Sequence, residues 1–140
     1  MKALSVGTII YKNGNFLMGR ATRTGGRHDI FKGYNEEGES HVTTCLRELK
    51  EESGIVTTES NLLPLGVFNY MPNKDLSLFL MKDLSDLPEL TDLTCTSMVK
   101  DEFPEMDSYR WVSYEELKSS KIKVGKKLRE LLLLIHEEVL

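Results

Sequence analysis

A segment of 23 residues, 33–55, places tight limits on the local structure that this chain can form. It reads GYNEEGESHVTTCLRELKEESGI, a polar stretch with two glycines followed by a run with helical spacing. Ser40 is a residue type that caps helix N-termini, and Gly54 is the residue type that most often follows a helix C-terminus. The segment therefore predicts a loop over residues 33–39 and a helix that follows Ser40 and runs through Ser53.

The predicted helix has two different faces. At about 100° per residue, four apolar side chains share one arc: Val42, Cys45, Leu46 and Leu49. A second arc holds the carboxylates of Glu48, Glu51 and Glu52, which are three or four positions apart. Like charges at this spacing destabilise a helix unless protonation or a cation relieves them. Clustered carboxylate oxygens suit Mg²⁺ or Mn²⁺. The acidic face is therefore a candidate metal site, and a solvated acidic surface is the alternative.

The net charge of the chain is concentrated in this segment. The 140 residues carry 18 Lys plus Arg against 22 Asp plus Glu, for a net charge of -4. Residues 33–55 hold six of the acids and two of the bases, so the rest of the chain is balanced. A total pI near 5.4 argues against a non-specific nucleic-acid binder. The acidity marks one site and is not a general property of the surface.

The spacing of the segment resembles the Nudix box. That motif is Gly-x5-Glu-x7-Arg-Glu-U-x-Glu-Glu-x-Gly-U, with U apolar, and every specified position is matched from Gly33 through Glu39 and Arg47 to Ile55. Relatives commonly read Trp-x-x-Pro-Lys-Gly before the box, whereas this chain has His28-Asp29-Ile30-Phe31-Lys32-Gly33. The missing proline predicts a less rigid loop ahead of the helix.

The remaining residues alternate between strand and helix patterns. Strands are expected over residues 4–11, 16–20, 64–70, 75–81 and 109–112, with a short extended piece over 29–32 and a loop-rich stretch over 83–107. Ser113 and Glu116 form a capping-box pattern for a short helix to residue 118. A last helix over residues 124–139 would bury Val124, Leu128, Leu131, Leu132, Ile135 and Val139. We expect one α/β (α+β) domain over residues 1–140 in which a mixed central sheet lies between helices, as in the Nudix fold.

The resemblance also implies an activity. Nudix enzymes hydrolyse the pyrophosphate of a nucleoside diphosphate linked to another moiety, using Mg²⁺ or Mn²⁺. Residues 2–20, 65–70, 73–76 and 104–107 resemble more loosely the Nudix hydrolases of T4-type phages, which act on ADP-ribose, FAD and diadenosine polyphosphates. Hydrolysis of (deoxy)nucleoside triphosphates or capped RNA is an alternative, and so is a nucleotide-sensing module without catalysis. The intact set of Glu48, Glu51 and Glu52 argues against such a module.

Site roles follow from the resemblance. Metal ligands would be Glu48, Glu51 and Glu52 with the carbonyl of Lys32 or Gly33. Arg47 would orient Glu39 through two hydrogen bonds. Glu48, Glu52, Arg47 and Glu105 are the candidate catalytic residues. The general base stays open between a box glutamate and the later loop, where Glu102, Asp101 and Asp107 compete with Glu105.

Substrate contacts are less specific. Arg20, Arg23 and Arg27 lie in or beside one polar loop and are candidates to pair with phosphate. Tyr70 is a candidate to stack on a base, whereas Phe68 and His28 are expected to serve packing. Leu131–Leu134 leaves a homodimer contact open. Two cysteines without metal-ligand spacing, Cys45 and Cys95, suggest reduced thiols in a cytoplasmic protein. No apolar run is long enough to span a membrane, and a small-molecule nucleotide is the expected partner, not a nucleic acid.

Overall fold

The N-terminal strand forms the middle of a mixed sheet. In the computed structural model, which describes residues 2–99 and 102–140, β1 (Ala3–Ile9) pairs antiparallel with β5 (Phe31–Tyr34) and parallel with β7 (Lys74–Met81). β6 (Leu62–Met71) pairs antiparallel with β7, which gives the strand order β5–β1–β7–β6. β5, which ends in Gly33 and Tyr34, therefore lies at one end of this order.

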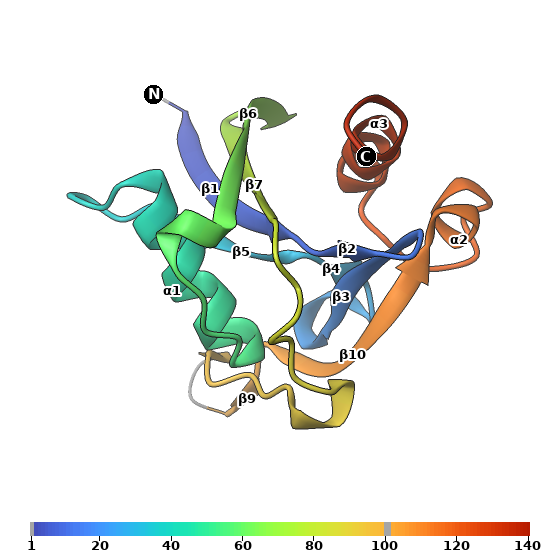
Figure 1. Cartoon of the computed structure of the whole chain (residues 1–140), viewed down its shortest axis with the longest axis horizontal. Coiled ribbons are helices and arrows are strands. Elements are labelled where there is room, and N and C mark those ends of the chain that lie inside the picture. The colour runs from blue at the N-terminus through green and yellow to red at the C-terminus, as the bar shows by residue number, and fades with distance from the viewer. Residues whose placement is uncertain (1, 100–101) are drawn as a thin grey trace.

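A second sheet packs beside the first (Figure 1). Its strands are β2 (Tyr11–Lys12), β3 (Asn15–Ala21), β4 (His28–Asp29) and β10 (Met106–Ser113). They pair in the order β10–β3–β2, and β4 also pairs with β3. Asn13 and Gly14 form the turn between β2 and β3 with positive φ angles of 53° and 82°. The turn joins β2 and β3 into an antiparallel hairpin.

Two expected segments are divided between the sheets. The predicted strand over residues 4–11 is wrong as one element, because the chain leaves the first sheet after Ile9 and enters the second at Tyr11. The extended piece over residues 29–32 is divided in the same way between β4 and β5. The residues before the helix are also less loop-like than expected, since residues 31–34 pair in register with residues 5–8 of β1. Strand pairing there supplies the rigidity that the missing proline would have given.

The loop-rich stretch over residues 83–107 contains short elements. β8 (Met98–Val99) pairs with β9 (Phe103–Pro104), and η3 (Leu90–Asp92) is a 3₁₀ turn in the same stretch. Two further 3₁₀ turns, η1 (Thr22–Thr24) and η2 (Glu59–Asn61), lie elsewhere among the described residues. Thr22 N–H donates to Glu105 O (2.9 Å), and Glu105 N–H donates to Ser97 O (2.8 Å). These bonds fasten the β8–β9 hairpin to η1 across more than 70 residues of chain.

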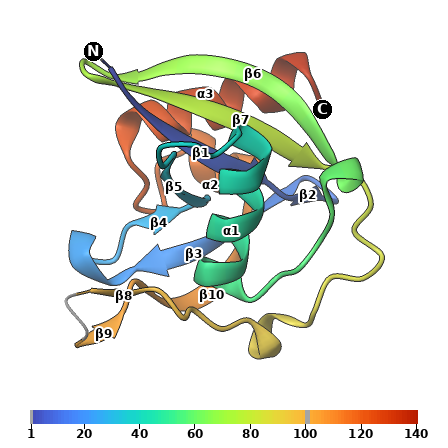
Figure 2. The same ribbon diagram turned by 90° about the vertical axis from the view of Figure 1, so that its left-hand side faces the viewer.

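Helices cover both faces of the first sheet (Figures 1 and 2). α1 (His41–Ser53) lies on one face and α3 (Lys126–Glu138) on the other, while α2 (Tyr114–Lys118) follows β10. Ser40 Oγ accepts from Thr43 N–H, and Gly54 at φ 80° ends α1, as predicted. The Ser113–Glu116 capping box of α2 is present in full. The expected fold class, a mixed sheet between helices, is confirmed.

The core has one cluster on each side of the sheet. Cys45 and Leu49 of α1 pack on the β1–β5 side, and Leu128, Leu132 and Ile135 of α3 pack on the other. The last helix is shorter than predicted, and Val139 is 51% exposed because it caps the C-terminus of α3. Both cysteines are free and buried. Across the described residues, no helix combines the length and apolarity needed to cross a membrane.

Candidate active site

The acidic face of α1 lies against β5. Glu48 and Glu52 are 8% and 6% exposed, so their carboxylates are buried although the sequence pattern alone allows a solvated face. Lys32 N–H in β5 donates to Glu52 Oε1 (2.6 Å), and Tyr109 Oη in β10 donates to Glu52 O (2.6 Å). These bonds hold the last turn of α1 against both sheets.

Gly33 lets the helix approach this closely. A Cβ atom at position 33 would lie 2.0 Å from Glu48 Cδ, so only a residue without a side chain leaves room for this carboxylate. The φ angle of Gly33 is not positive, so the requirement is one of space and not of backbone conformation. The first glycine of the motif is therefore explained by its contact with Glu48.

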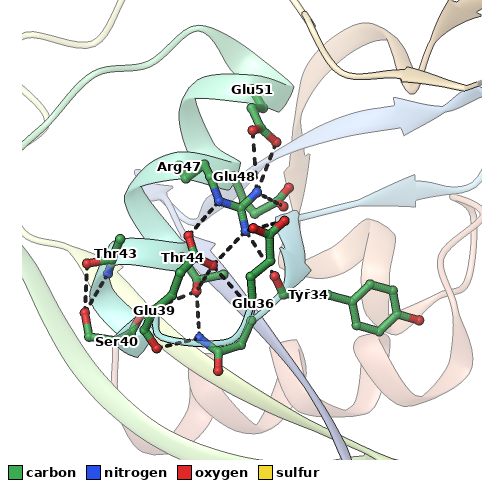
Figure 3. A network of polar contacts seen from close by, with 10 residues as sticks. Tyr34, Glu36, Glu39, Ser40, Thr43, Thr44, Arg47, Glu48 and Glu51 are labelled. Atoms are coloured by element: carbon green, nitrogen blue, oxygen red, sulfur yellow. Dashed lines mark hydrogen bonds and ion pairs between the residues drawn. The ribbon is translucent and has the colours of Figure 1, made fainter. Parts of the chain in front are cut away.

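Arg47 joins the loop to the helix (Figure 3). Its guanidinium donates to both Glu39 oxygens (2.8 and 2.9 Å) and to Tyr34 O (3.1 Å). The same group donates to Glu48 Oε1 (2.8 Å) and lies 3.4 Å from Glu51 Oε2. The bidentate pair with Glu39 is the contact that the sequence resemblance implies.

The loop is tied further through Glu39. Its Oε1 accepts from Glu36 N–H (3.0 Å) and Thr44 Oγ1 (2.9 Å). The hydrogen bonds with Arg47 and with Glu36 N–H lower the pKa of Glu39 to about 2. Glu39 is therefore an anion that fastens residues 35–39 to the start of α1.

The pKa values of the two buried carboxylates, Glu48 and Glu52, are raised, in contrast to that of Glu39. Burial and the neighbouring charge of Glu51 raise the pKa of Glu48 to about 7. Burial raises the pKa of Glu52 to about 9, and the charges of Asp29 and Glu48 contribute to the rise. Two carboxylates that are difficult to ionise side by side favour a nearby cation.

A cavity of about 390 Å³ opens over these carboxylates. Its floor includes Gly33, Glu48 and Glu52, and its walls come from β5, β7, η1 and the β8–β9 hairpin. The wall residues with polar side chains include Arg23, Lys32, Tyr34, Lys74, Ser97 and Glu105. We call this the acidic cavity. Glu105 lies close enough for its charge to contribute to the raised pKa of Glu48.

The structure places the other candidate residues as follows. Arg27 and Tyr70 line a second cavity of about 160 Å³, which shares Asp29 and Lys32 with the acidic cavity. Arg20 lines neither cavity, and its guanidinium pairs with Asp107 (2.5 Å). Glu102 is exposed and lines neither cavity, and Asp101 lies outside the described residues. Of the three arginines near the loop, Arg23 is the one that reaches the acidic cavity.

Sequence reasoning missed several residues of the walls, among them Tyr34, Lys74 and Ser97. These three residues come from separate strands or loops, and nothing in their local spacing distinguishes them from ordinary surface residues. Only the pairing of β5 and β7 on either side of β1 brings the first two together.

The carboxylates are engaged by protein donors. Arg47 Nη1 contacts Glu48 and Glu51, and Lys32 N–H contacts Glu52. Within residues 2–99 and 102–140, no three His, Cys, Asp or Glu side chains are arranged to coordinate one ion. The donor chemistry nonetheless fits a hard divalent cation, because the two buried carboxylates, Glu48 and Glu52, face one cavity.

Comparisons with known proteins bear on the family of the chain. A family model described as the NUDIX domain matches residues 1–134. The "Uncharacterized 17.7 kDa protein in e-segB intergenic region" of Enterobacteria phage T4 is 35% identical over 122 aligned residues, which span 78% of this chain and 81% of that protein.

Solved structures show the same fold. The MutT protein from Methanosarcina mazei Go1 superposes with a TM-score of 0.71 at 21% identity, covering 98% of this chain and 94% of that chain. An Ap4A hydrolase from C. elegans superposes with a TM-score of 0.63 at 20% identity, covering 97% and 96%. The match of the family model over nearly the whole chain, together with the complete motif around Gly33 and α1, shows that this protein belongs to the Nudix family of pyrophosphohydrolases.

Proposed function

We propose that this protein hydrolyses the pyrophosphate bond of a nucleoside diphosphate linked to another moiety, of the ADP-ribose, FAD or diadenosine polyphosphate type, with Mg²⁺ as cofactor. The observation that carries the proposal is the pair of buried carboxylates, Glu48 and Glu52, on the floor of the acidic cavity. A pyrophosphate diester carries two negative charges, so this floor would repel it without a bound cation.

The residues that would hold Mg²⁺, or Mn²⁺, are Glu48, Glu51 and Glu52, with the Gly33 carbonyl beside them. Such an ion supplies charge neutralisation on the phosphate and a more acidic bound water. Arg47 donates to Glu48 and lies close to Glu51 in the structure, so a bound ion would share these carboxylates with the guanidinium. The two bonds from Arg47 to Glu39 would continue to order the loop.

The walls supply the remaining contacts. Arg23 lines the acidic cavity and is the candidate to pair with a phosphate oxygen. Arg27 and Tyr70 line the adjoining cavity and are candidates to contact the substrate there. Glu105 shares the acidic cavity with Glu48 and Glu52 and is a candidate to accept the proton of the attacking water. Arg20, held by Asp107, is a weaker candidate than the sequence suggests.

Two further observations support the substrate type. One is the sequence resemblance to the Nudix hydrolases of T4-type phages. The other is the fold shared with a protein named as an Ap4A hydrolase. Neither support ranks ADP-ribose, FAD and diadenosine polyphosphates against each other, so the test uses all three.

The test incubates the protein with Mg²⁺ and ADP-ribose, FAD, diadenosine triphosphate, NADH or deoxynucleoside triphosphates, and identifies products by chromatography. We expect AMP and ribose 5-phosphate from ADP-ribose. No turnover of any compound would refute the proposed function, and turnover of triphosphates alone would assign the other substrate class.

Two variants separate the roles of the carboxylates. Glu52→Gln should abolish both turnover and the rise in melting temperature on adding Mg²⁺, whereas the exposed control Glu59→Gln keeps both. Glu105→Gln should lower kcat at least tenfold and keep the Mg²⁺-dependent rise, because Glu105 is not among the proposed ion ligands. A fully active Glu52→Gln variant would remove the metal assignment.

A further inference from the structure

Tyr34 has no packing role that explains its position. Its side chain is 59% exposed at the end of β5 and belongs to neither core cluster. The backbone carbonyl of Tyr34 serves the site by accepting from Arg47, but Figure 3 shows the ring directed away from that network. A large aromatic ring is thus presented at the rim of the acidic cavity, which it lines.

Lys74 accompanies this ring. Its Nζ lies 4.6 Å from the Tyr34 ring centroid, and both side chains line the acidic cavity. Lys74 begins β7, and the two residues meet because β1 pairs with β5 on one side and with β7 on the other. The contact therefore depends on the central sheet and not on a mobile loop.

Lys74 forms no close ion pair with a described residue. Lys32 pairs with Asp29 (3.2 Å) and Lys2 with Asp75 (3.1 Å), but no carboxylate among the described residues lies within 4 Å of Lys74 Nζ. An available cation at the rim of an otherwise acidic cavity is suited to a ligand that carries phosphate. An exposed tyrosine ring beside it is suited to a flat aromatic system, since bases stack on aromatic side chains without regard to sequence.

We propose that Tyr34 and Lys74 form a subsite that binds the aromatic base of a nucleotide by stacking on Tyr34 and its phosphate through Lys74. The subsite rests on the proposed function. It adds to that function the contact by which the site would tell a nucleotide, which carries a base, from a sugar phosphate, which does not. It is formed by β5 and β7, whereas Arg23 of η1 lines the same acidic cavity. A pyrophosphate over Glu48 and Glu52 would therefore share the cavity with the cationic residues Lys74 and Arg23.

The test compares two ligands that differ by the base. AMP and ribose 5-phosphate are used as inhibitors of ADP-ribose hydrolysis, and their inhibition constants are measured for wild type, Tyr34→Ala and Lys74→Ala. Loss of stacking should raise the constant for AMP about tenfold in Tyr34→Ala and leave that for ribose 5-phosphate within twofold. Lys74→Ala should raise both constants, because both ligands carry the phosphate.

The chain offers a matched control. Tyr114 and Lys118 of α2 form another tyrosine–lysine pair, with Lys118 Nζ 5.7 Å from the ring centroid, and neither residue lines the acidic cavity. Tyr114→Ala and Lys118→Ala should leave both inhibition constants unchanged. Equal rises for AMP and ribose 5-phosphate in Tyr34→Ala, or no rise for either, would overturn the subsite.

A direct binding measurement keeps the two proposals separable. In Tyr34→Trp an indole replaces the phenol, and AMP should quench its fluorescence in the presence of Mg²⁺, whereas ribose 5-phosphate should not. If wild type hydrolyses no nucleotide, the proposed function fails and this titration alone decides the subsite. Quenching supports the subsite, and no quenching at millimolar AMP refutes it.

Discussion

Replacing Gly33 by Ala should separate activity from stability. The added Cβ would lie 2.0 Å from Glu48 Cδ, whereas ordinary contact begins at 3.4 Å, so the carboxylate must move by about 1.4 Å. The atom displaced is the far end of a flexible side chain, and the backbone at position 33 has no positive φ that alanine would resist. Displacement of a reacting group by about 1 Å can lower rates about 100-fold.

The folded state should tolerate the same change. Glycine-to-alanine replacement stabilises by about 0.4–1 kcal/mol through the unfolded chain, which offsets part of the loss of the Glu48–Arg47 contact. We therefore expect the melting temperature without metal to change by less than about 4 °C, while kcat/KM for ADP-ribose falls about 100-fold. Gly125→Ala is the control, because a Cβ there meets nothing within 4 Å.

Turnover assays with Mg²⁺ and thermal melts on the same preparations decide the matter. A Gly33→Ala protein with wild-type kcat/KM would show that the position of the Glu48 carboxylate against β5 is not needed for catalysis. A variant that loses activity only because it unfolds would show that Gly33 serves the fold and not the placement of Glu48.

Two predictions concern the Arg47–Glu39 pair. Arg47→Lys removes the bidentate contact with Glu39 and should lower the free energy of unfolding, measured by urea denaturation, by about 2 kcal/mol. The control is Arg110→Lys, which changes an exposed arginine with a single bond to Glu116 and should lower the free energy of unfolding by less than about 1 kcal/mol. Equal effects would show that the bidentate contact of Arg47 adds no more stability than the single bond. The pKa of Glu39 is lowered to about 2, so its stabilising contribution is complete above the unfolded pKa near 4.5 and is lost as the pH falls through 2. Melts between pH 5 and pH 2 should therefore fall less steeply for Glu39→Gln than for wild type, and parallel curves would contradict the assignment.

Much of the site could be predicted from sequence because its contacts are local. Ser40 and Gly54 delimit α1 through hydrogen bonds to residues within four positions, and Arg47 reaches Glu39 and Glu51 across one or two helical turns. Such contacts depend on spacing along one helix and its loop, so the residues themselves determine them.

The two sheets were harder to predict, since strand patterns do not reveal partners. Residues 4–11 have one continuous β-forming pattern, yet β1 and β2 belong to different sheets. The reason is that β1 pairs with β7, whereas β2 pairs with β3. The burial of Glu48 and Glu52 likewise depends on β5, which packs against the acidic side of α1.

The sequence alone therefore determined the helix, its caps and the line of carboxylates, since each arises from interactions within about 20 residues. The tertiary structure alone decided which of three neighbouring arginines reaches the cavity and which distant side chains join it. Arg23 lines the cavity while Arg20 is held by Asp107, and Glu105 is placed there by bonds between its hairpin and η1. Tyr34 and Lys74, 40 positions apart, meet because β1 lies between their strands. Strand pairing over such separations depends on the whole sheet, so no local pattern could specify it.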